Sequence, residues 1–241
     1  MPKSITITIF LLEAMFDVEL MLLVATGFVL GLAHALDSDH VIALSTILCN
    51  SPSLRKSIVS ATAWGTGHSA TLLIVGLLVL AFRVVIPESI MSLLELPAGI
   101  ALIILGIFLI RSLVKNNANI HQHTHPHIHL DGNGKSYVHT HAHLHKSAFT
   151  GILQGLGGSA AVMLVTLATV PSAELGFVFI LIFGVGVILG MVSIACLIGS
   201  LLTLTASRFK KVHEKIEAVT GLISIGFGVF IIVQVVLQYT F

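Results

Sequence analysis

Charged residues are scarce in this sequence. Only 10% of its 241 residues are Asp, Glu, Lys or Arg, whereas 56% are hydrophobic and the mean hydropathy is +1.03. A soluble domain carries roughly 25% charged residues, because its surface must face water. A very large soluble core is the alternative interpretation, but this chain has too few charges to cover a water-exposed globule. The composition therefore predicts a protein embedded in a lipid bilayer.

Other signals are also missing. The net charge is +1, so nothing indicates a nucleic-acid partner. The two cysteines, Cys49 and Cys196, lie far apart in or beside apolar segments, which is neither a disulfide framework nor a CxxC metal site. No GxxxxGK[ST] phosphate loop occurs. Because no nucleophile arrangement or HExxH pair is present either, we expect no enzymatic activity.

Six apolar segments are long enough to cross a membrane, which takes about 20 residues. They cover residues 20–48, 57–82 and 92–113, then 149–170, 175–204 and 216–237. Segments of this length favour helices over the shorter strands of a membrane β-barrel. Residues 5–16 are too short to span; they lie at the interface or extend the first helix, and no A-x-A-like site indicates a cleaved signal peptide. We therefore predict an all-α, polytopic membrane protein with six transmembrane helices.

The first segment is unusually long for a single span. Its 29 residues would reach about 43 Å as one helix, against a hydrocarbon core of about 30 Å. It also contains Asp37 and Asp39. We expect this helix to be tilted, to protrude, or to be broken at the charged stretch, as helices are at ion sites of transporters.

Lysine and arginine set the expected orientation. With six spans, ten basic residues fall on one side and only Lys3 and Arg83 on the other. We expect the protein in the cell membrane (inner or plasma membrane), and the bias predicts that both termini lie outside and the long middle loop lies in the cytoplasm. The ten are Arg55, Lys56, Arg111, Lys115, Lys135, Lys146, Arg208, Lys210, Lys211 and Lys215.

The two halves of the chain share a glycine pattern. Gly27 and Gly31 precede Gly151 and Gly155 by 124 positions, and similar offsets of 119 and 122 relate glycines of the later segments. The pattern favours a duplication, with residues 1–115 and 147–241 as three-helix units around a loop at 116–146. Two such units in tandem insert in opposite orientations and give a 3+3 inverted repeat. Small-residue helix packing without common ancestry is the alternative.

The chemistry is concentrated in His34-Ala-Leu-Asp37-Ser-Asp39-His40. Each ionisable group inside a membrane helix costs about 2.5–3.5 kcal/mol on insertion scales, and a bound cation would offset this cost. At 100° per residue, His34, Asp37 and His40 face one point, whereas Asp39 points elsewhere and would orient a histidine, or bind metal itself if the helix is unwound. Imidazole with carboxylate suits Ni²⁺, Co²⁺ and Zn²⁺. A proton relay or ion-paired cluster without metal is the alternative.

A second motif, Trp64-Gly-Thr-Gly-His68-Ser69, lies in the second segment. A lone buried histidine is more often a packing residue than a ligand. Because the preceding segment holds an incomplete metal site, we predict that His68 completes it and include Ser69 as a further candidate ligand. The flanking Gly65 and Gly67 would allow another helix to approach closely.

These motifs resemble those of the nickel/cobalt transporter (NiCoT) superfamily. The signature H-x4-D-H is present as His34, Asp39 and His40, and Asp37 fits the fuller form HAxDxDH. Helix number and a histidine-rich middle loop make the shorter, six-helix UreH-like members the nearest match. The resemblance implies secondary transport of Ni²⁺ or Co²⁺, often supplying metalloenzymes such as urease or hydrogenase.

The second half departs from the longer members of that superfamily, which carry an acidic, threonine-containing motif there. The corresponding stretch here starts at Gly155 and has no acid. A ligand from the second half must therefore be weaker, and the candidates are Gln154, Ser159, Met163 and Thr166.

The middle loop contains nine histidines in two clusters with H-x-H spacing. Asp131-Gly-Asn-Gly134 between them is a turn signal that would fold the clusters together as a hairpin. We expect a disordered loop that buffers or captures metal; a tether whose histidines do nothing specific is the alternative. The histidines are His121, His123, His125, His127, His129, His139, His141, His143 and His145.

The leading hypothesis is a permease for Ni²⁺ or Co²⁺, with Zn²⁺ as a further cargo and no other cofactor. The expected partners are the divalent ion and the bilayer, with a second copy of the chain or a metallochaperone as candidates. An exporter of the same metals is the first alternative. A membrane sensor or assembly protein that binds metal without transporting it is the second.

Overall fold

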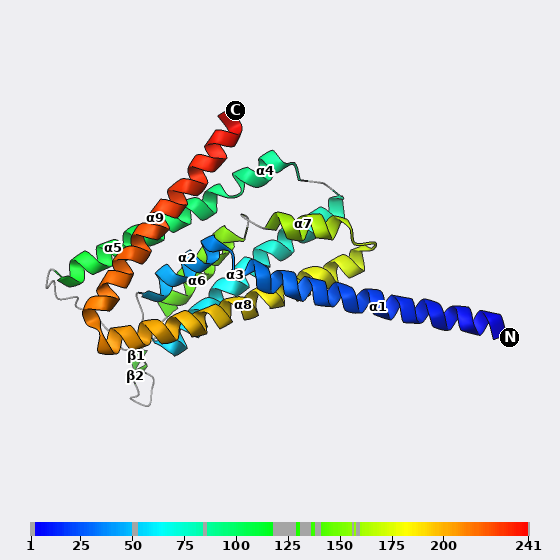
Figure 1. Cartoon of the computed structure of the whole chain (residues 1–241), viewed down its shortest axis with the longest axis horizontal. Coiled ribbons are helices and arrows are strands. Elements are labelled where there is room, and N and C mark those ends of the chain that lie inside the picture. Colours follow the sequence, from blue (N-terminus) through cyan, green and yellow to red (C-terminus); the bar gives the residue numbers. More distant parts are fainter. Residues whose placement is uncertain are drawn as a thin grey trace.

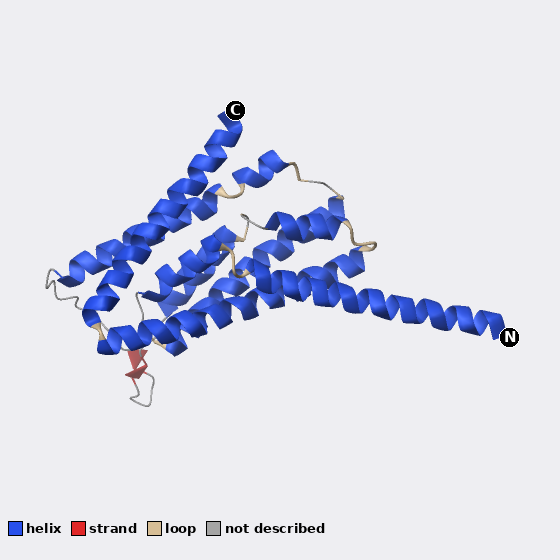
Figure 2. Cartoon of the chain, in the orientation of Figure 1, coloured by secondary structure: helices blue, strands red, loops and turns tan. Residues whose placement is uncertain are grey.

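The computed structural model describes residues 3–49, 53–83, 86–117, 129–130, 136–137, 141–155, 157 and 160–240. These residues are almost entirely helical (Figure 2). The one strand pair described, β1 (His129–Leu130) and β2 (Ser136–Tyr137), is antiparallel and flanks the expected turn of the middle loop. The helices are α1 (Lys3–His34), α2 (Ser38–Cys49), α3 (Leu54–Phe82), α4 (Glu88–Leu93), α5 (Leu96–Asn117), α6 (His141–Gln154), α7 (Ala160–Ala168), α8 (Ala173–Arg208) and α9 (Lys210–Thr240).

The first long segment is broken at its charged stretch. α1 ends at His34 and α2 begins at Ser38, and the two helices are bent by 57°. The amide of Asp37 donates to the carbonyl of His34 at 3.1 Å, a bond across three residues that tightens the last turn before the break. Residues 5–16 extend α1 at its amino end, which projects from the bundle in Figure 1.

The expected segment at 149–170 differs most from the structure. It comprises two helices: α6, which begins at His141 inside the expected loop, and the short α7. Gly155 and Gly157 follow the end of α6, and glycine disfavours helix because its backbone is the most flexible. The expected segment 92–113 also divides, into α4 and α5, at a turn that contains Glu95.

Among the described residues, four helical segments are long and apolar enough to cross a membrane. They are Leu54–Phe82, Ser89–Lys115 (which runs through α4 and α5), Ala173–Arg208 and Lys210–Thr240. The bent pair Val18–His34 and Ser38–Cys49 is a fifth span if its two helices cross the membrane as one unit. Large apolar side chains point outward from them, such as Phe108 and Leu222, which are exposed as lipid-facing residues would be. The chain is thus a helical, multi-pass membrane protein.

The spanning helices pack in pairs. α5 lies along α9, and α3 lies along α8, while α1 packs on α8 and α6 packs on α3 (Figure 1). In the first pair, Gly99 meets Gly228 and Gly106 meets Gly221, so the two helices run antiparallel. The Ser224 hydroxyl adds a hydrogen bond to the carbonyl of Leu102 at 2.8 Å.

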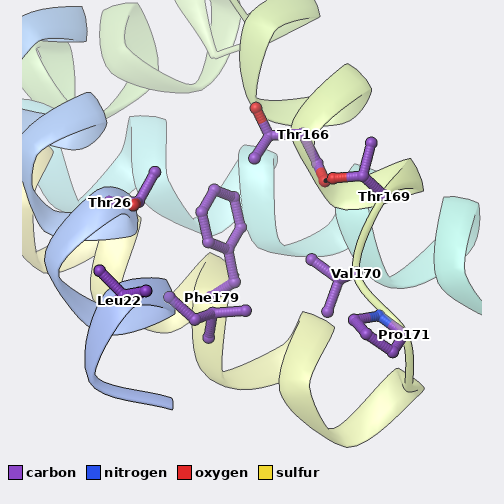
Figure 3. A pocket seen from close by; sticks show the side chains of 8 residues that line it. Leu22, Thr26, Thr166, Thr169, Val170, Pro171 and Phe179 are labelled. Atoms are coloured by element: carbon purple, nitrogen blue, oxygen red, sulfur yellow. Dashed lines mark hydrogen bonds between the residues drawn. The ribbon is translucent and has the colours of Figure 1, made fainter. Parts of the chain in front are cut away.

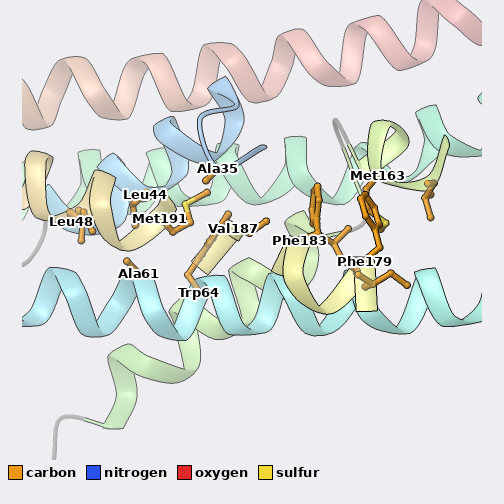
Figure 4. Packing of buried hydrophobic residues seen from close by; sticks show 14 of the residues in the cluster. Ala35, Leu44, Leu48, Ala61, Trp64, Met163, Phe179, Phe183, Val187 and Met191 are labelled. Carbon is orange, nitrogen blue, oxygen red and sulfur yellow. The ribbon is translucent and has the colours of Figure 1, made fainter. Parts of the chain in front are cut away.

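The core fills the space between α1, α2, α3, α7 and α8. Leu44, Leu48 and Met191 form one part of it, and Phe179 and Phe183 form another (Figure 4). Three of these helices, α1, α2 and α3, each also carry one buried histidine: His34, His40 and His68.

Candidate metal centre

Three histidines meet where α1 breaks. His34 is the last residue of α1, His40 lies in the first turn of α2, and His68 lies midway along α3. They are 4%, 0% and 0% exposed, and one ring nitrogen of each lies within 4.8 Å of the others. The closest pair is His34 Nε2 and His68 Nε2, at 2.8 Å.

The break in the helix determines how His40 is oriented. Its Nδ1 lies 2.9 Å from the carbonyl oxygen of His34, and a carbonyl can only accept a hydrogen bond. Nδ1 is therefore the N–H donor, and in the neutral ring Nε2 carries a lone pair. Nε2 lies 3.5 Å from Asp39 Oδ2 and has no hydrogen-bond partner. His40 thus presents a nitrogen that is free to bind a cation.

Asp37 orients His34 in the same manner. Its Oδ2 lies 3.0 Å from Nδ1 of His34. Because a carboxylate accepts, Nδ1 is the donor and Nε2 of the neutral ring is the lone-pair nitrogen, directed at His68. A carboxylate that fixes the ring of a ligating histidine is the usual companion of a metal site.

Asp37, Asp39 and His40 form a second group, whose ligand atoms also lie within 4.8 Å of one another. The two groups share His40. On one ideal helix Asp39 would point away from the other motif residues, but the 57° bend brings it to Asp37. The sequence had left open that Asp39 would bind metal itself if the helix were unwound, and the helix is indeed broken here. His34 lies with His40 and His68, and both aspartates lie with His40.

The remaining predicted residues lie elsewhere or outside the described residues. Ser69 donates its hydroxyl proton to the carbonyl of Gly184 on α8, at 3.2 Å. His121, His123, His125, His127 and His139 fall outside the described residues. His129 lies in β1, and α6 contains His141, His143 and His145, of which the last is exposed.

Trp64 was not assigned a role from the sequence, yet it lies against the cluster. Its ring stacks on His68, with centroids 5.1 Å apart and an interplanar angle of 13°, and it meets His40 edge-on at 5.1 Å. Trp64 is fully buried, and its Nε1 has no hydrogen-bond partner. Trp64 lies one helical turn before His68 in the same helix, and this spacing could have indicated that its ring contacts the histidine.

A small pocket lies apart from the histidines. Its lining includes Thr26 of α1, Phe179 of α8, and Thr166, Thr169 and Val170 at the end of α7 (Figure 3). The Thr169 hydroxyl donates to the carbonyl of Thr166 at 2.7 Å. No ionisable side chain lines this pocket, so it is a poor place for a bare divalent ion.

The sequence is similar to those of three known proteins. The chain is 41% identical over 213 residues to the urease accessory protein UreH of Bacillus sp. (strain TB-90), a match that covers 88% of this chain and 91% of that protein. Two chloroplast proteins of Arabidopsis thaliana, FOR GROWTH AND FERTILITY 2 and 1, are 28% and 26% identical over 87% of this chain, which spans 55% and 58% of their lengths. No family model and no solved structure matches. The resemblance that the motifs indicated is thereby confirmed, and the chain belongs to the family of UreH-like proteins.

Proposed function

We propose that this protein is a secondary transporter of Ni²⁺ or Co²⁺ across the cell membrane. The transport site consists of His34, Asp37, Asp39, His40 and His68. The observation that carries the proposal is the meeting of three buried histidines from separate helices at a break in a membrane helix. Buried ionisable groups in a membrane are costly and are typically found where an ion passes.

The ligand chemistry favours borderline divalent metals. Imidazole nitrogens with nearby carboxylates suit nickel, cobalt and zinc, whereas magnesium and calcium prefer all-oxygen sites. The name of the Bacillus relative links that protein to urease. Because the family resemblance implies nickel supply to metalloenzymes such as urease, nickel is the first candidate for this chain, with cobalt second and zinc third.

We further propose six spans arranged as a 3+3 inverted repeat, with α6 and α7 together forming the fourth span in chain order. Close helix contacts support a two-fold relation between the halves. A methyl group at Gly31 of α1 would collide with the carbonyl of Phe183 on α8, and one at Gly151 of α6 would collide with the carbonyl of Trp64 on α3. The same two-fold relation matches Gly186 of α8 with Gly67 of α3. A methyl group at Gly186 would collide with the carbonyl of Phe28 on α1, and one at Gly67 would collide with the carbonyl of Ala148 on α6.

These contacts suggest a different register for the repeat. Gly31 corresponds to Gly151, 120 positions later, and Phe183 lies 119 positions after Trp64. The sequence alignment had placed Gly27 on Gly151, one helical turn away. The antiparallel contacts of α3 with α8 agree with units of opposite orientation: Gly65 meets Ile188, and Gly184 meets Ser69. Rocking of two such units about the histidines would expose the site to each side in turn.

The excess of basic residues on one side supports a cytoplasmic middle loop, where its histidines would buffer or capture the metal. No nucleotide-binding loop is present in the sequence, so a gradient or a partner subunit supplies the driving force. Protons are a suitable coupling ion, since metal binding to histidine and aspartate releases them. A metallochaperone or a second copy of the chain is a reasonable partner.

Two alternatives remain distinguishable by experiment. An exporter would use the same site with flux in the other direction. A membrane sensor or assembly protein would bind the metal and show no flux. We propose no enzymatic activity for this chain.

The test measures ⁶³Ni and ⁵⁷Co flux in vesicles that contain the wild type, His34→Ala or the control His213→Gln. His213 lies in α9, pairs with Glu217 at 3.3 Å and belongs to neither of the two candidate metal-binding groups. We expect flux for the wild type and control and its loss for His34→Ala. Equal flux in all three proteins would refute transport through this site, binding without flux would indicate the sensor, and the direction of flux separates import from export.

A further inference from the structure

One glutamine in the second half of the chain has no visible reason to be buried. Gln154, the last residue of α6, is 0% exposed, yet neither its amide oxygen nor its amide nitrogen has a hydrogen-bond partner. A buried polar group without a partner is destabilising, and native proteins have few of them. Such a group calls for a ligand or a functional explanation.

The other unpartnered groups all belong to the histidine centre. Among the described residues, every buried side-chain nitrogen or oxygen without a hydrogen-bond partner lies on His40, Trp64, His68 or Gln154. The first three residues are in mutual ring contact. Gln154 is therefore the one member of this set that comes from the second half.

The packing of α6 brings Gln154 to the same turn of α3. Gly151, one turn before Gln154, lies against the backbone of Trp64 and His68. Gly155, the next residue, lies against the carbonyl of His68, where a methyl group would come within 2.8 Å. Residues three apart in a helix share a face, so Gln154 lies on or beside the face that Gly151 turns toward α3.

Gln154 also takes the place of His34 under the two-fold relation. His34 ends α1 three residues after Gly31, and Gln154 ends α6 three residues after Gly151. The next residues, Ala35 and Gly155, are matched as well. Ala35 lies against Gly190 of α8, and Gly155 lies against Thr71 of α3. Thr71 and Gly190 are 119 positions apart, close to the offset between the halves.

We infer that Gln154 is a ligand of the transported ion, contributed through its amide oxygen by the second half of the chain. The inference rests on the proposed function. Gln154 and His34 would occupy equivalent positions at the two helix breaks, and the ion would lie between them beside His68. An amide oxygen is neutral and binds borderline metals less strongly than imidazole. It would therefore complete the coordination shell without holding the ion too tightly for release.

The experiment measures Ni²⁺ and Co²⁺ binding to the purified full-length protein in detergent, for the wild type, Gln154→Leu and Gln154→Glu. Gln234→Leu, at an exposed glutamine of α9, is the matched control. We expect Gln154→Leu to weaken Ni²⁺ binding about tenfold or more and to raise the melting temperature of the metal-free protein, because an unsatisfied amide is replaced by an apolar group. Gln154→Glu keeps the shape and adds a charged oxygen, so it should retain binding and change the visible absorption spectrum of bound Co²⁺.

Each outcome has one interpretation. Wild-type affinity in Gln154→Leu, or a Co²⁺ spectrum that is the same in Gln154→Glu and the wild type, would overturn the role of Gln154 while the transport proposal stands. If the wild type itself binds neither metal, the proposed function fails and the inference with it. If Gln154→Leu does not fold, Gln154→Glu decides the matter through its Co²⁺ spectrum.

Discussion

His34 Nε2 lies 2.8 Å from His68 Nε2, although the two residues are 34 positions apart and belong to different helices. Two nitrogens bound to one ion at about 2.1 Å each would lie about 3 Å apart at a right angle. The pair is thus already near the spacing that a shared ion requires. Without an ion, the contact needs one ring to donate its proton to the other.

The first prediction concerns the coupling between these two rings. His34→Ala and His68→Ala should each weaken Ni²⁺ binding strongly, and the double variant should lose less than the sum of the two. The reason is that one ion links both residues, and residues in contact typically show coupling energies of about 0.5–3 kcal/mol. Titration calorimetry on the four proteins of the cycle provides the measurement. Strictly additive losses would show that the two histidines do not hold the same ion.

The second prediction concerns Asp37, which fixes the ring of His34 through a 3.0 Å contact. Asp37→Asn keeps the size of the side chain but removes the negative charge that favours the N–H at Nδ1. We expect metal affinity to fall about 10–100-fold, the usual effect of losing the partner of a ligating histidine. Asp17→Asn in the amino-terminal part of α1 is the matched control, because it lies 17 residues before His34. Equal affinities of Asp37→Asn and the wild type would assign Asp37 a purely structural role.

The third prediction tests the close helix contacts. A side chain at Gly151 would meet the carbonyl of Trp64, whereas nothing lies within 4 Å of the position that a methyl group would take at Gly226. Gly151→Ala should therefore destabilise the protein by about 1–3 kcal/mol through overpacking. Gly226→Ala, in the middle of α9, should stabilise it by about 0.5–1 kcal/mol, since alanine favours helix. Melting temperatures in one detergent give the comparison, and similar values for the two variants would argue against the α3–α6 contact.

Much of the membrane architecture was predictable because it depends on run length and polarity. The second segment was expected at 57–82 and is found at Leu54–Phe82. The histidine pairing across helices was predictable only in outline: an unpaired histidine next to an incomplete ligand set suggested His68, but no pattern within one helix gives a distance between two helices.

The remaining differences arise where helices break. Periodicity assumes a straight helix, so it turned Asp39 away from the other ligands, whereas the bend between α1 and α2 brings Asp39 to Asp37. The same limit applies to Gln154, which the sequence offered only as one of several weak ligands. Its distinguishing feature is burial without a partner, a property of packing among several helices rather than of the local sequence.

The fourth prediction concerns sidedness. The excess of basic residues on one side predicts that Lys135 lies in the cytoplasm and Arg83 outside. We expect a membrane-impermeant maleimide to label Arg83→Cys in intact cells and Lys135→Cys only in inside-out vesicles, in a background carrying Cys49→Ala and Cys196→Ala. Labelling of both positions from the same side would contradict the proposed six-span topology.

The fifth prediction concerns the nine histidines between residues 121 and 145, which we propose to replace together by asparagine. In an importer, a loop on the cytoplasmic side, as we propose, meets the ion only after translocation, so the initial rate of ⁶³Ni uptake should match the wild type at every nickel concentration. The amount of metal retained per protein should fall, because imidazoles that buffer the ion are removed.

In an exporter the same loop would gather the ion before translocation, and its loss would slow efflux mainly when cytoplasmic nickel is scarce. His68→Ala serves as the reference, since it should abolish flux in either direction. Complete loss of flux in the loop variant would show that these histidines belong to the transport pathway itself.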